Sequence, residues 1–380
     1  MDLARVESIV NAVLYEGYML YPYRPTSVKN RQRWTFGGLY PRSYSAAQDG
    51  TDAWAAQTEC LVVSQGAARV DVKVRFLHLL SRDVRAFDHP EPERFDNAES
   101  APERIADLES ASHPVDALWV GDWLIQTWQE AEEREVDIAG LDLAALTRQP
   151  REVAFAFPAC RTSESLVDPS GNRIGLVIRE QQPIQARAFV CAERLVDQLF
   201  KLTVRIKNET DWEARRVSSP GADPRTADNP QAGRAHALMC SLISTHTILG
   251  IQNGQFVSLL DPPPEWGAYA ARCRNVGAWP VLVGDEGEQN MMLSSPIILY
   301  DYPQVAPESP GNLFDGTEID EILTLRIMTL TEDEKREMVA VDEHARALLE
   351  RTQALTAEQL MRLHGSVRGL EVRASEVQRG

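Results

Sequence analysis

Two histidines and one cysteine form the most metal-like group of side chains in the sequence. His236, Cys240 and His246 lie within the stretch HALMCSLISTH. Imidazole nitrogen and thiolate sulfur are ligands of zinc and of nickel, so the group could hold either ion. The spacing is loose, however, and a small buried cysteine beside two histidines in ordinary polar contacts is the commoner arrangement. We therefore expect no bound cofactor, and zinc or nickel at these three residues is the alternative.

A stretch rich in tyrosine, arginine and lysine near the N-terminus could bind another molecule. It reads YEGYMLYPYRPTSVKNRQRW, residues 15–34. Tyrosine, tryptophan and arginine dominate the hot spots of protein interfaces, and the same residues can stack on bases and bind phosphates. A third interpretation is that the rings pack on the protein itself. The residues that we assign to partner binding are Tyr18, Tyr21, Tyr23, Arg24, Lys29, Arg31, Arg33 and Trp34.

The charge balance argues against a nucleic-acid partner. The whole chain has a net charge of −17, although residues 1–44 carry six cationic and three acidic groups. A body this acidic would repel a polyanion or an anionic membrane surface. No run approaches the ~20 apolar residues of a membrane-spanning helix, so we expect no membrane insertion. The basic arm, residues 15–34, is therefore expected to bind protein or to pack on its own chain.

Four carboxylates form a second candidate site in FDGTEIDEIL. Carboxylates can bind a hard cation or exchange protons with a substrate, but the spacing is not that of an EF-hand. Acidic residues also gather in the first turn of helices, because the helix dipole favours them there. We interpret the group as a helix start, with a cation site or a contact to the basic arm of another molecule as alternatives. Its members are Asp315, Glu318, Asp320 and Glu321.

Familiar catalytic motifs are absent from the sequence. It contains no Walker A motif, no GxGxxG after a strand, no HExxH and no GxSxG. The five cysteines are widely spaced and include no CxxC pair, which favours reduced thiols and a cytoplasmic location. The N-terminal residues lack the basic and apolar regions of a signal peptide. These observations favour a non-catalytic protein.

Alternating apolar residues predict that strands position these groups. The period is two in residues 69–76, 151–157, 174–178 and 200–208, and further apolar segments at 244–251, 255–260, 279–284 and 294–302 also resemble strands. Gln252-Asn253-Gly254 predicts a hairpin turn between two of them. Strands that follow one another without regular helices favour antiparallel sheets. We predict a mainly β (α+β) fold with an antiparallel β-sandwich-like core.

Helices are predicted at a few places only. Apolar spacing indicates a helix over residues 3–14. Thr127 and Glu130 resemble a capping box, which predicts a helix near residues 127–134. Two further capping boxes, Thr331 with Glu334 and Thr356 with Gln359, predict a C-terminal helical hairpin. Long loops are expected at residues 83–114, 213–234 and 303–318, which are rich in proline and polar residues.

These elements divide the chain into three regions. Residues 1–50 form the N-terminal helix and the basic arm. Residues 51–325 form the β-rich core, and residues 326–380 form the C-terminal helices. Partner identity and oligomeric state do not follow from this division, and a homo-oligomer is compatible with it.

Three segments together resemble a known family. They are YEGYMLYPYR…KNRQRWTFGGLYP, STHTIL…FVSLLDPP and SPIILYDYPQVAPESPGNLFDGTEIDEILTLR. They are similar to an uncharacterised bacterial protein family encoded beside NiFe-hydrogenase structural and maturation genes. The resemblance implies an accessory or assembly role around a metalloenzyme, and it transfers no catalytic residue, since none is established for the family. Gene proximity is an associational argument rather than a mechanism.

The sequence therefore leads to two hypotheses about function. The first is a non-catalytic accessory protein that binds a partner protein, namely a hydrogenase subunit or its maturation machinery. The alternative is a metal-binding protein or metalloenzyme that uses the His/Cys/His group.

Overall fold

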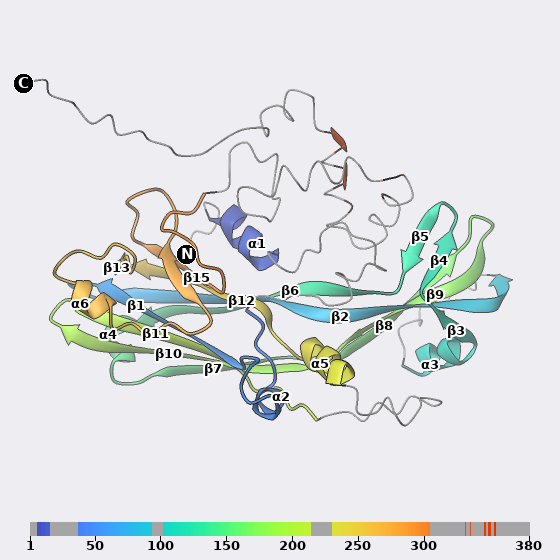
Figure 1. Ribbon diagram of the computed structural model, residues 1–380, viewed down its shortest axis with the longest axis horizontal. Coiled ribbons are helices and arrows are strands. Elements are labelled where there is room, and N and C mark those ends of the chain that lie inside the picture. Colours follow the sequence, from blue (N-terminus) through green and yellow to red (C-terminus); the bar gives the residue numbers. More distant parts are fainter. Residues whose placement is uncertain are drawn as a thin grey trace, which may run out of the picture.

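The chain forms two antiparallel sheets that pack face to face (Figure 1). This computed structural model describes residues 6–15, 37–92, 102–213 and 230–304, and a few separate residues further on: Thr331, Lys335, Arg346, Leu349, Glu350, Gln353 and Ala354. The helices are α1 (Glu7–Tyr15), α2 (Arg42–Ala47), α3 (Pro102–Ser110), α4 (Leu143–Leu146), α5 (Pro230–Met239) and α6 (Gly267–Ala270). The strands are β1 (Ala55–Val63), β2 (Arg69–Pro92), β3 (Ser112–Val115), β4 (Ala117–Val120), β5 (Trp123–Gln126), β6 (Trp128–Asp142), β7 (Arg151–Phe157), β8 (Cys160–Val167), β9 (Asn172–Gln181), β10 (Ile184–Val196), β11 (Leu199–Asn208), β12 (Ile243–Gln252), β13 (Gln255–Val257), β14 (Trp279–Leu282) and β15 (Met291–Ser295).

The strand order confirms the predicted antiparallel, mainly β fold. One sheet has the order β13-β1-β11-β10-β7, and the other has the order β14-β15-β12-β2-β9-β8. Strands β3 and β6 pair with β2 beside this path, and β4 and β5 form a separate two-stranded sheet. Every strand pairing in the described parts of the chain is antiparallel.

The core lies between the two sheets. Val70, Val72, Val74 and Phe76 of β2 point into it, as their period of two predicts, and alternate residues of β10 and β11 meet them from the other sheet. The Phe76 ring contacts two aromatic rings of β7, with centroid distances of 6.3 and 5.7 Å. Because both sheets contribute to one apolar cluster, they stabilise each other.

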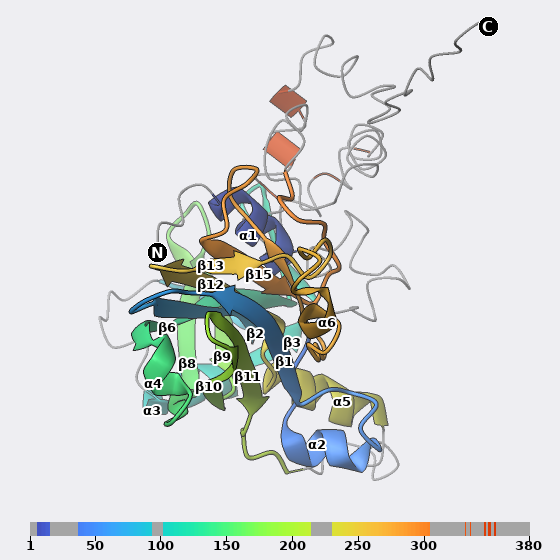
Figure 2. The same ribbon diagram turned by 90° about the vertical axis from the view of Figure 1, so that its left-hand side faces the viewer.

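Helix α1 covers the outer face of the second sheet. Its apolar residues Val10 and Val13, with Val6 just before it, pack against β12, β14 and β15. Leu14 adds to a second cluster with Leu77 of β2, whose side chain points away from the core. The predicted N-terminal helix is confirmed over its described residues. Figure 2 shows α1 on this face, while α2 and α5 lie together on another side of the molecule.

Strand β2 is 24 residues long and extends well beyond the sandwich. Its first part pairs with β12 and β6, and its last part pairs with β9 and β3. Figure 1 shows β2 running along the long axis of the molecule into an extension that contains β3, β4, β5, β8, β9 and α3. The long loop predicted for residues 83–114 is therefore wrong where the structure describes it, because most of those residues form β2, α3 and β3.

The acidic segment predicted as a helix near residues 127–134 is strand β6 instead. Its carboxylates lie opposite cations of β2: Lys73 faces Asp137 and Arg75 faces Glu135. Lys73 Nζ is 2.8 Å from Glu135 and 3.1 Å from Asp137, and Arg75 Nε forms an ion pair with Glu135 at 2.7 Å. Opposite charges across two strands stabilise the pairing, and this long-range match outweighs the local capping pattern.

Thr127 does not cap a helix. Its hydroxyl group donates a hydrogen bond to the Val115 carbonyl at 2.9 Å and accepts one from the Val84 amide at 3.0 Å. The side chain thus bonds to both β2 and the end of β3. The capping-box prediction failed because a threonine hydroxyl bonds equally well to strand backbone.

Two other local predictions were also wrong. The turn at residues 252–254 does not close a hairpin, because β12 and β13 belong to different sheets and the chain passes between them there. Asn253 has a φ of 58°, a left-handed conformation that asparagine tolerates. Strand β15 ends at Ser295, so residues 296–302 are bends and coil rather than strand.

Parts of other predictions lie outside the described residues. In the loop predicted at residues 213–234, residues 230–234 belong to α5, and residues 214–229 are not described. Of the predicted C-terminal helices, the separately described Lys335, Arg346 and Leu349 are helical.

Candidate functional site

A short hairpin, β4–β5, projects from the extension (Figure 1). Its strands pair from Ala117 opposite Gln126 to Val120 opposite Trp123, so only Gly121 and Asp122 form the turn. Gly121 has a φ of 59°. Two-residue hairpin turns of this kind favour positive φ, which glycine adopts without strain. The local sequence therefore specifies a tight hairpin.

Apolar contacts fix one face of this hairpin to the extension. Leu118, Val120 and Ile125 pack against a cluster formed by β2, β8 and β9. Gly175 in β9 leaves the space that Leu118 fills, because a Cβ atom there would collide with Leu118 Cδ2 and with the carbonyl oxygen of Arg85. The hairpin is thus held in a defined orientation.

Two tryptophans of the hairpin are exposed to solvent. Trp119 is 51% exposed and Trp123 is 57% exposed, although tryptophan is usually largely buried. Asp116 and Asp122 beside them are also exposed. Trp119 pairs with Leu124 and Trp123 pairs with Val120, so the two rings lie on opposite faces of the hairpin. Residues 112–127 contain no lysine or arginine, so the hairpin as a whole is aromatic and acidic. Aromatic side chains presented by a rigid element are typical of protein-binding surfaces.

A row of ion pairs stabilises the sheet where the hairpin joins it. Arg82 donates from Nε to the Gln126 carbonyl at 2.9 Å, and its Nη1 is 2.8 Å from Glu130. Glu130 also bonds to Arg179 at 2.9 Å, and Arg179 reaches Glu164 at 2.8 Å. The network joins β2, β6, β8 and β9, and Arg82 within it is buried. Buried charges are tolerated because each has a partner.

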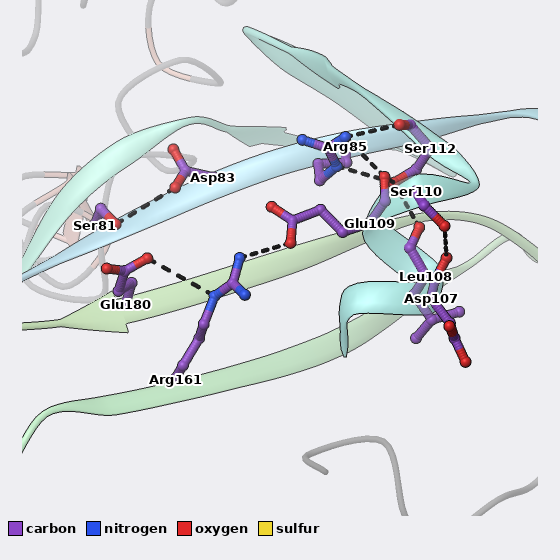
Figure 3. Close-up of polar contacts among 10 residues, drawn as sticks. All are labelled: Ser81, Asp83, Arg85, Asp107, Leu108, Glu109, Ser110, Ser112, Arg161 and Glu180. Carbon is purple, nitrogen blue, oxygen red and sulfur yellow. Dashed lines mark hydrogen bonds and ion pairs between the residues drawn. The ribbon is translucent and has the colours of Figure 1, made fainter. Parts of the chain in front are cut away.

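A second polar network fixes α3 to the opposite face of the extension (Figure 3). Arg85 donates to the carbonyl oxygens of Glu109 and Ser112, at 2.9 and 2.7 Å, and so satisfies acceptors at the helix C-terminus. Arg161 of β8 lies 2.7 Å from the Glu109 carboxylate and 3.7 Å from Glu180. These contacts hold the helix on the sheet.

Asp83 lies beside this network with one weak partner. Ser81 donates a hydrogen bond to its carboxylate at 3.4 Å (Figure 3). The pKa of Asp83 is raised, mainly because nearby protein atoms desolvate the carboxyl group and also because Glu180 and Glu109 repel its charge. The nearby arginines, Arg85 and Arg161, already bind the end of α3. The polar groups around Asp83 are therefore explained by attachment of this helix to the sheet.

The three predicted metal ligands lie in different surroundings. His236 is on α5, where its Nδ1 accepts a hydrogen bond from Trp212 at 2.9 Å. Cys240 is buried just after α5, and His246 is buried in β12 with Nδ1 3.0 Å from the Ser244 carbonyl oxygen. Among the residues that the structure describes, no group of three or more His, Cys, Asp or Glu side chains is arranged to hold a metal. The structure therefore does not bring these three together as ligands, and metal binding stays a prediction.

Two histidines are buried in the protein. His78 and His246 each have a pKa lowered to about 4, mainly because burial disfavours the charged imidazolium. His78 Nε2 is 2.8 Å from the Gln182 carbonyl oxygen. A cation near each histidine, Arg134 and Arg75 respectively, lowers the pKa further.

An aromatic cluster holds the chain that follows the basic arm. The Tyr40 and Tyr44 rings stack with centroids 5.3 Å apart, and Trp212 meets Tyr44 edge-on at 5.1 Å. Arg234 of α5 lies 5.3 Å from the Tyr40 ring centroid and 2.6 Å from Asp52. This cluster joins residues 37–52 to α5, where both meet the end of β11.

The two other predicted sites lie outside the described residues. These are the partner-binding residues of the basic arm, Tyr18 to Trp34, and the acidic group at residues 315–321. Only Tyr15 at the start of the arm falls within a described element, α1.

Comparison with known proteins adds no family. The sequence matches neither a protein-family model nor an individual curated protein. Within the described ranges, no helix is long and apolar enough to cross a membrane.

The hairpin was missed in the sequence, although a signal for it exists. Gly121-Asp122 lies between the apolar runs ALWV and WLIQ. A glycine-containing pair between two apolar runs is a hairpin signal. Prediction of a loop over residues 83–114 and a helix from 127 left these residues without an assignment.

Proposed function

We propose that this chain is a non-catalytic accessory protein that binds another protein through the β4–β5 hairpin. The exposure of Trp119 and Trp123 on a rigidly attached, projecting element supports the proposal. A soluble protein gains nothing in stability from exposed tryptophans, whereas burial of such rings against a partner contributes strongly to binding. A preorganised hairpin also loses little conformational freedom when it binds.

The proposed partner is a NiFe-hydrogenase subunit or a component of its maturation machinery, and the proposed location is the cytoplasm. The resemblance of three sequence segments to a family encoded beside hydrogenase genes supports this choice. The basic arm is a second proposed contact, since its tyrosines and arginines suit an interface. Opposite charge on hairpin and arm would let them contact different patches of one partner.

Co-expression of the tagged full-length chain with individual hydrogenase and maturation proteins tests the proposal. We expect the double variant Trp119→Ala/Trp123→Ala to recover at least tenfold less partner than the wild type, because each ring lost from an interface centre weakens binding by about 1–2 kcal/mol or more. Tyr300→Ala is the matched control, because Tyr300 is an aromatic residue that is 86% exposed on another part of the molecule.

The outcomes test the roles of the hairpin and the arm and the choice of partner separately. Full recovery of the partner by a double variant with an unchanged circular dichroism spectrum would overturn the role of the hairpin. A second variant, Tyr23→Ala/Arg24→Ala/Arg31→Ala/Arg33→Ala, tests the arm in the same way. Failure of the wild type to bind any co-expressed hydrogenase protein would overturn the choice of partner.

A further inference from the structure

One edge of the first sheet is open along a whole strand. Strand β7 pairs with β10 on one side only, and it is the outermost strand of its sheet (Figure 1). No further strand of the described ranges lies beyond it. A free strand edge offers backbone N–H and C=O groups to another strand, and proteins usually protect such edges.

The register shows which backbone groups of β7 point outward. In the neighbouring strand β10, the Gln185 carbonyl oxygen accepts a hydrogen bond from the Glu209 amide at 2.8 Å, and the Gln185 N–H bonds to the same side. Both groups thus point away from β7. Ala156 lies opposite Gln185, and opposite residues of an antiparallel pair either bond to each other or both point away. The N–H and C=O groups of Ala156 therefore point to the open edge, and by alternation so do those of Ala154 and Glu152.

Nothing in the described ranges protects this edge. The outward backbone groups form no hydrogen bond with another described element, and the side chains of Glu152, Ala154 and Ala156 are exposed. Residues 151–157 contain no lysine, no proline and no bulge. Other edge strands are blocked in familiar ways: β13 is only three residues long, β14 contains Pro280, and β6 is rich in carboxylates. Strand β7 has none of these features.

The backbone of β7 is complementary to that of a second copy. Two antiparallel copies centred on Ala154 overlap along the full strand, so that Arg151 of each lies opposite Phe157 of the other. Each outward residue then exchanges two hydrogen bonds with its opposite, about six in all. Pro150 and Pro158 occupy the next outward positions on either side and have no N–H group, so a shifted register would lose hydrogen bonds.

The side chains suit the same register. On the core side, Val153 of one copy lies opposite Phe155 of the other. Both are only partly buried at the rim of the core, and a pair of a β-branched and an aromatic residue stabilises neighbouring strands. On the outer side, Glu152 lies opposite Ala156, and its carboxylate is already paired with Arg187 at 3.1 Å. No like charges lie opposite each other in this register.

We propose that β7 is the interface of a homodimer, in which it pairs antiparallel with β7 of a second copy of this chain. The pairing joins the two five-stranded sheets into one continuous sheet. This inference does not rest on the β4–β5 hairpin or on the partner proposed above.

Sedimentation velocity of the full-length chain tests the dimer. We expect the wild type to dimerise between about 1 and 100 µM, in about 0.15 M salt to screen the negative charge of the chain. Ala154→Pro should raise the dissociation constant of the dimer at least tenfold, because it removes a central outward N–H that the sheet itself does not use. Ala154→Ser is the matched control, since it keeps the N–H and a small side chain, and it should dimerise like the wild type.

A second variant leaves the backbone intact. Ala154→Lys places two lysines directly opposite each other at the symmetry axis, and like charges in that position repel. It should also raise the dissociation constant at least tenfold. Circular dichroism spectra equal to that of the wild type show that the variants remain folded.

Cross-linking tests which surface forms the interface. The Cys160→Ser background removes the exposed cysteine. In this background, Ala154→Cys should give a covalent dimer with a short bismaleimide reagent. Ser110→Cys is the control, because Ser110 is exposed on α3, and it should give none.

Three results would overturn the inference. They are a monomeric wild type at the highest concentration, a dimer that folded Ala154→Pro and Ala154→Lys variants both retain, and equal cross-linking of the two cysteine variants. A monomeric wild type whose recovery of a co-expressed protein is lost in Ala154→Pro would overturn it as well, and would show that a strand of another protein occupies the edge.

Discussion

His78 and His246 carry the clearest expected pH dependence of this protein. Both are buried with pKa values lowered to about 4, compared with 6.5 in an unfolded chain. The unfolded state therefore binds protons first as the pH falls, and stability that is fully present above pH 6.5 is lost between pH 6.5 and 4. We expect a drop from pH 7.5 to 5 to lower the free energy of unfolding by about 2 kcal/mol per histidine.

Urea unfolding at the two pH values measures this effect. His246→Gln should remove its share of the pH dependence, whatever its own effect on stability at pH 7.5. His113→Gln is the control, because the His113 side chain is 52% exposed. A wild-type stability that does not change between pH 7.5 and 5 would contradict the prediction.

Glu130 and Glu164 offer a matched pair for the ion-pair network. Both bond to Arg179, but Glu130 is 20% exposed and also pairs with buried Arg82, whereas Glu164 is 62% exposed. Removal of one partner from a buried pair leaves an unpaired charge, while an exposed pair contributes little. We expect Glu130→Gln to destabilise the protein by about 2–4 kcal/mol and Glu164→Gln by less than about 1 kcal/mol.

Chemical denaturation of both variants at neutral pH gives the two values. Equal losses of stability would show that burial of Arg82 does not govern the network.

Glu130 also shows why single residues were hard to assign from sequence. Its partners Arg82 and Arg179 are far away along the chain, so the nearby Thr127 was the only partner that the sequence suggested. His236, Cys240 and His246 show the converse. Their closeness in sequence suggested one metal site, but the fold places them in different surroundings.

Among the elements, the β4–β5 hairpin depends on the absence of a side chain at Gly175. A methyl group there would collide with Leu118 and with the backbone of Arg85. We expect Gly175→Ala to detach the hairpin locally and to speed amide hydrogen exchange of residues 117–126 by at least tenfold, because a backbone neighbour cannot move aside easily.

Gly66→Ala is the control for this change, since nothing lies within 4 Å of a Cβ atom at that position. It should leave exchange in the hairpin unchanged. Exchange of residues 117–126 in Gly175→Ala at the wild-type rate would show that Leu118 finds another place, and that the close contact is not what holds the hairpin.

A strand could be predicted when its own residues carry the pattern that identifies it, and not when that pattern depends on a distant strand. Strands β7, β9 and β11 and the first part of β2, residues 69–76, were predicted because their apolar residues recur with a period of two, a pattern that is visible within each segment. Strand β6 was missed because its sequence is mainly acidic rather than alternately apolar, and acidic residues are as common in helices as in strands. Its identity becomes visible only beside the cations of β2.

For the whole molecule, the shared core predicts one cooperative sandwich with a less stable extension. Phe76 is fully buried between the sheets, so Phe76→Ala should lower the free energy of unfolding by about 3–5 kcal/mol and loosen both sheets together. Ile105 of α3 lies in a separate small cluster with β9. Ile105→Ala should therefore loosen α3 and the last part of β2 alone.

Hydrogen exchange of the two variants, followed by mass spectrometry, distinguishes these responses. Protection lost from β10 and β11 in Ile105→Ala would show that the extension and the sandwich unfold as one unit.

The fold class was predictable from strand periodicity, whereas the passage of the chain from β12 to β13 was not, because a turn sequence does not reveal which sheet receives the next strand.

The length of β2 has a consequence for how such a chain can change during evolution. The even-numbered side chains of β2 pack in the sandwich core in its first part and against the hairpin in its last part. The odd-numbered side chains face α1 in the first part and α3 in the last part. Insertion or deletion of a single residue near its middle would exchange the two faces of everything beyond that point, and Val84 would take the side of α3. Relatives of this protein should therefore conserve the spacing between Phe76 and Val84, or change it by two residues at a time, even where the residues themselves differ.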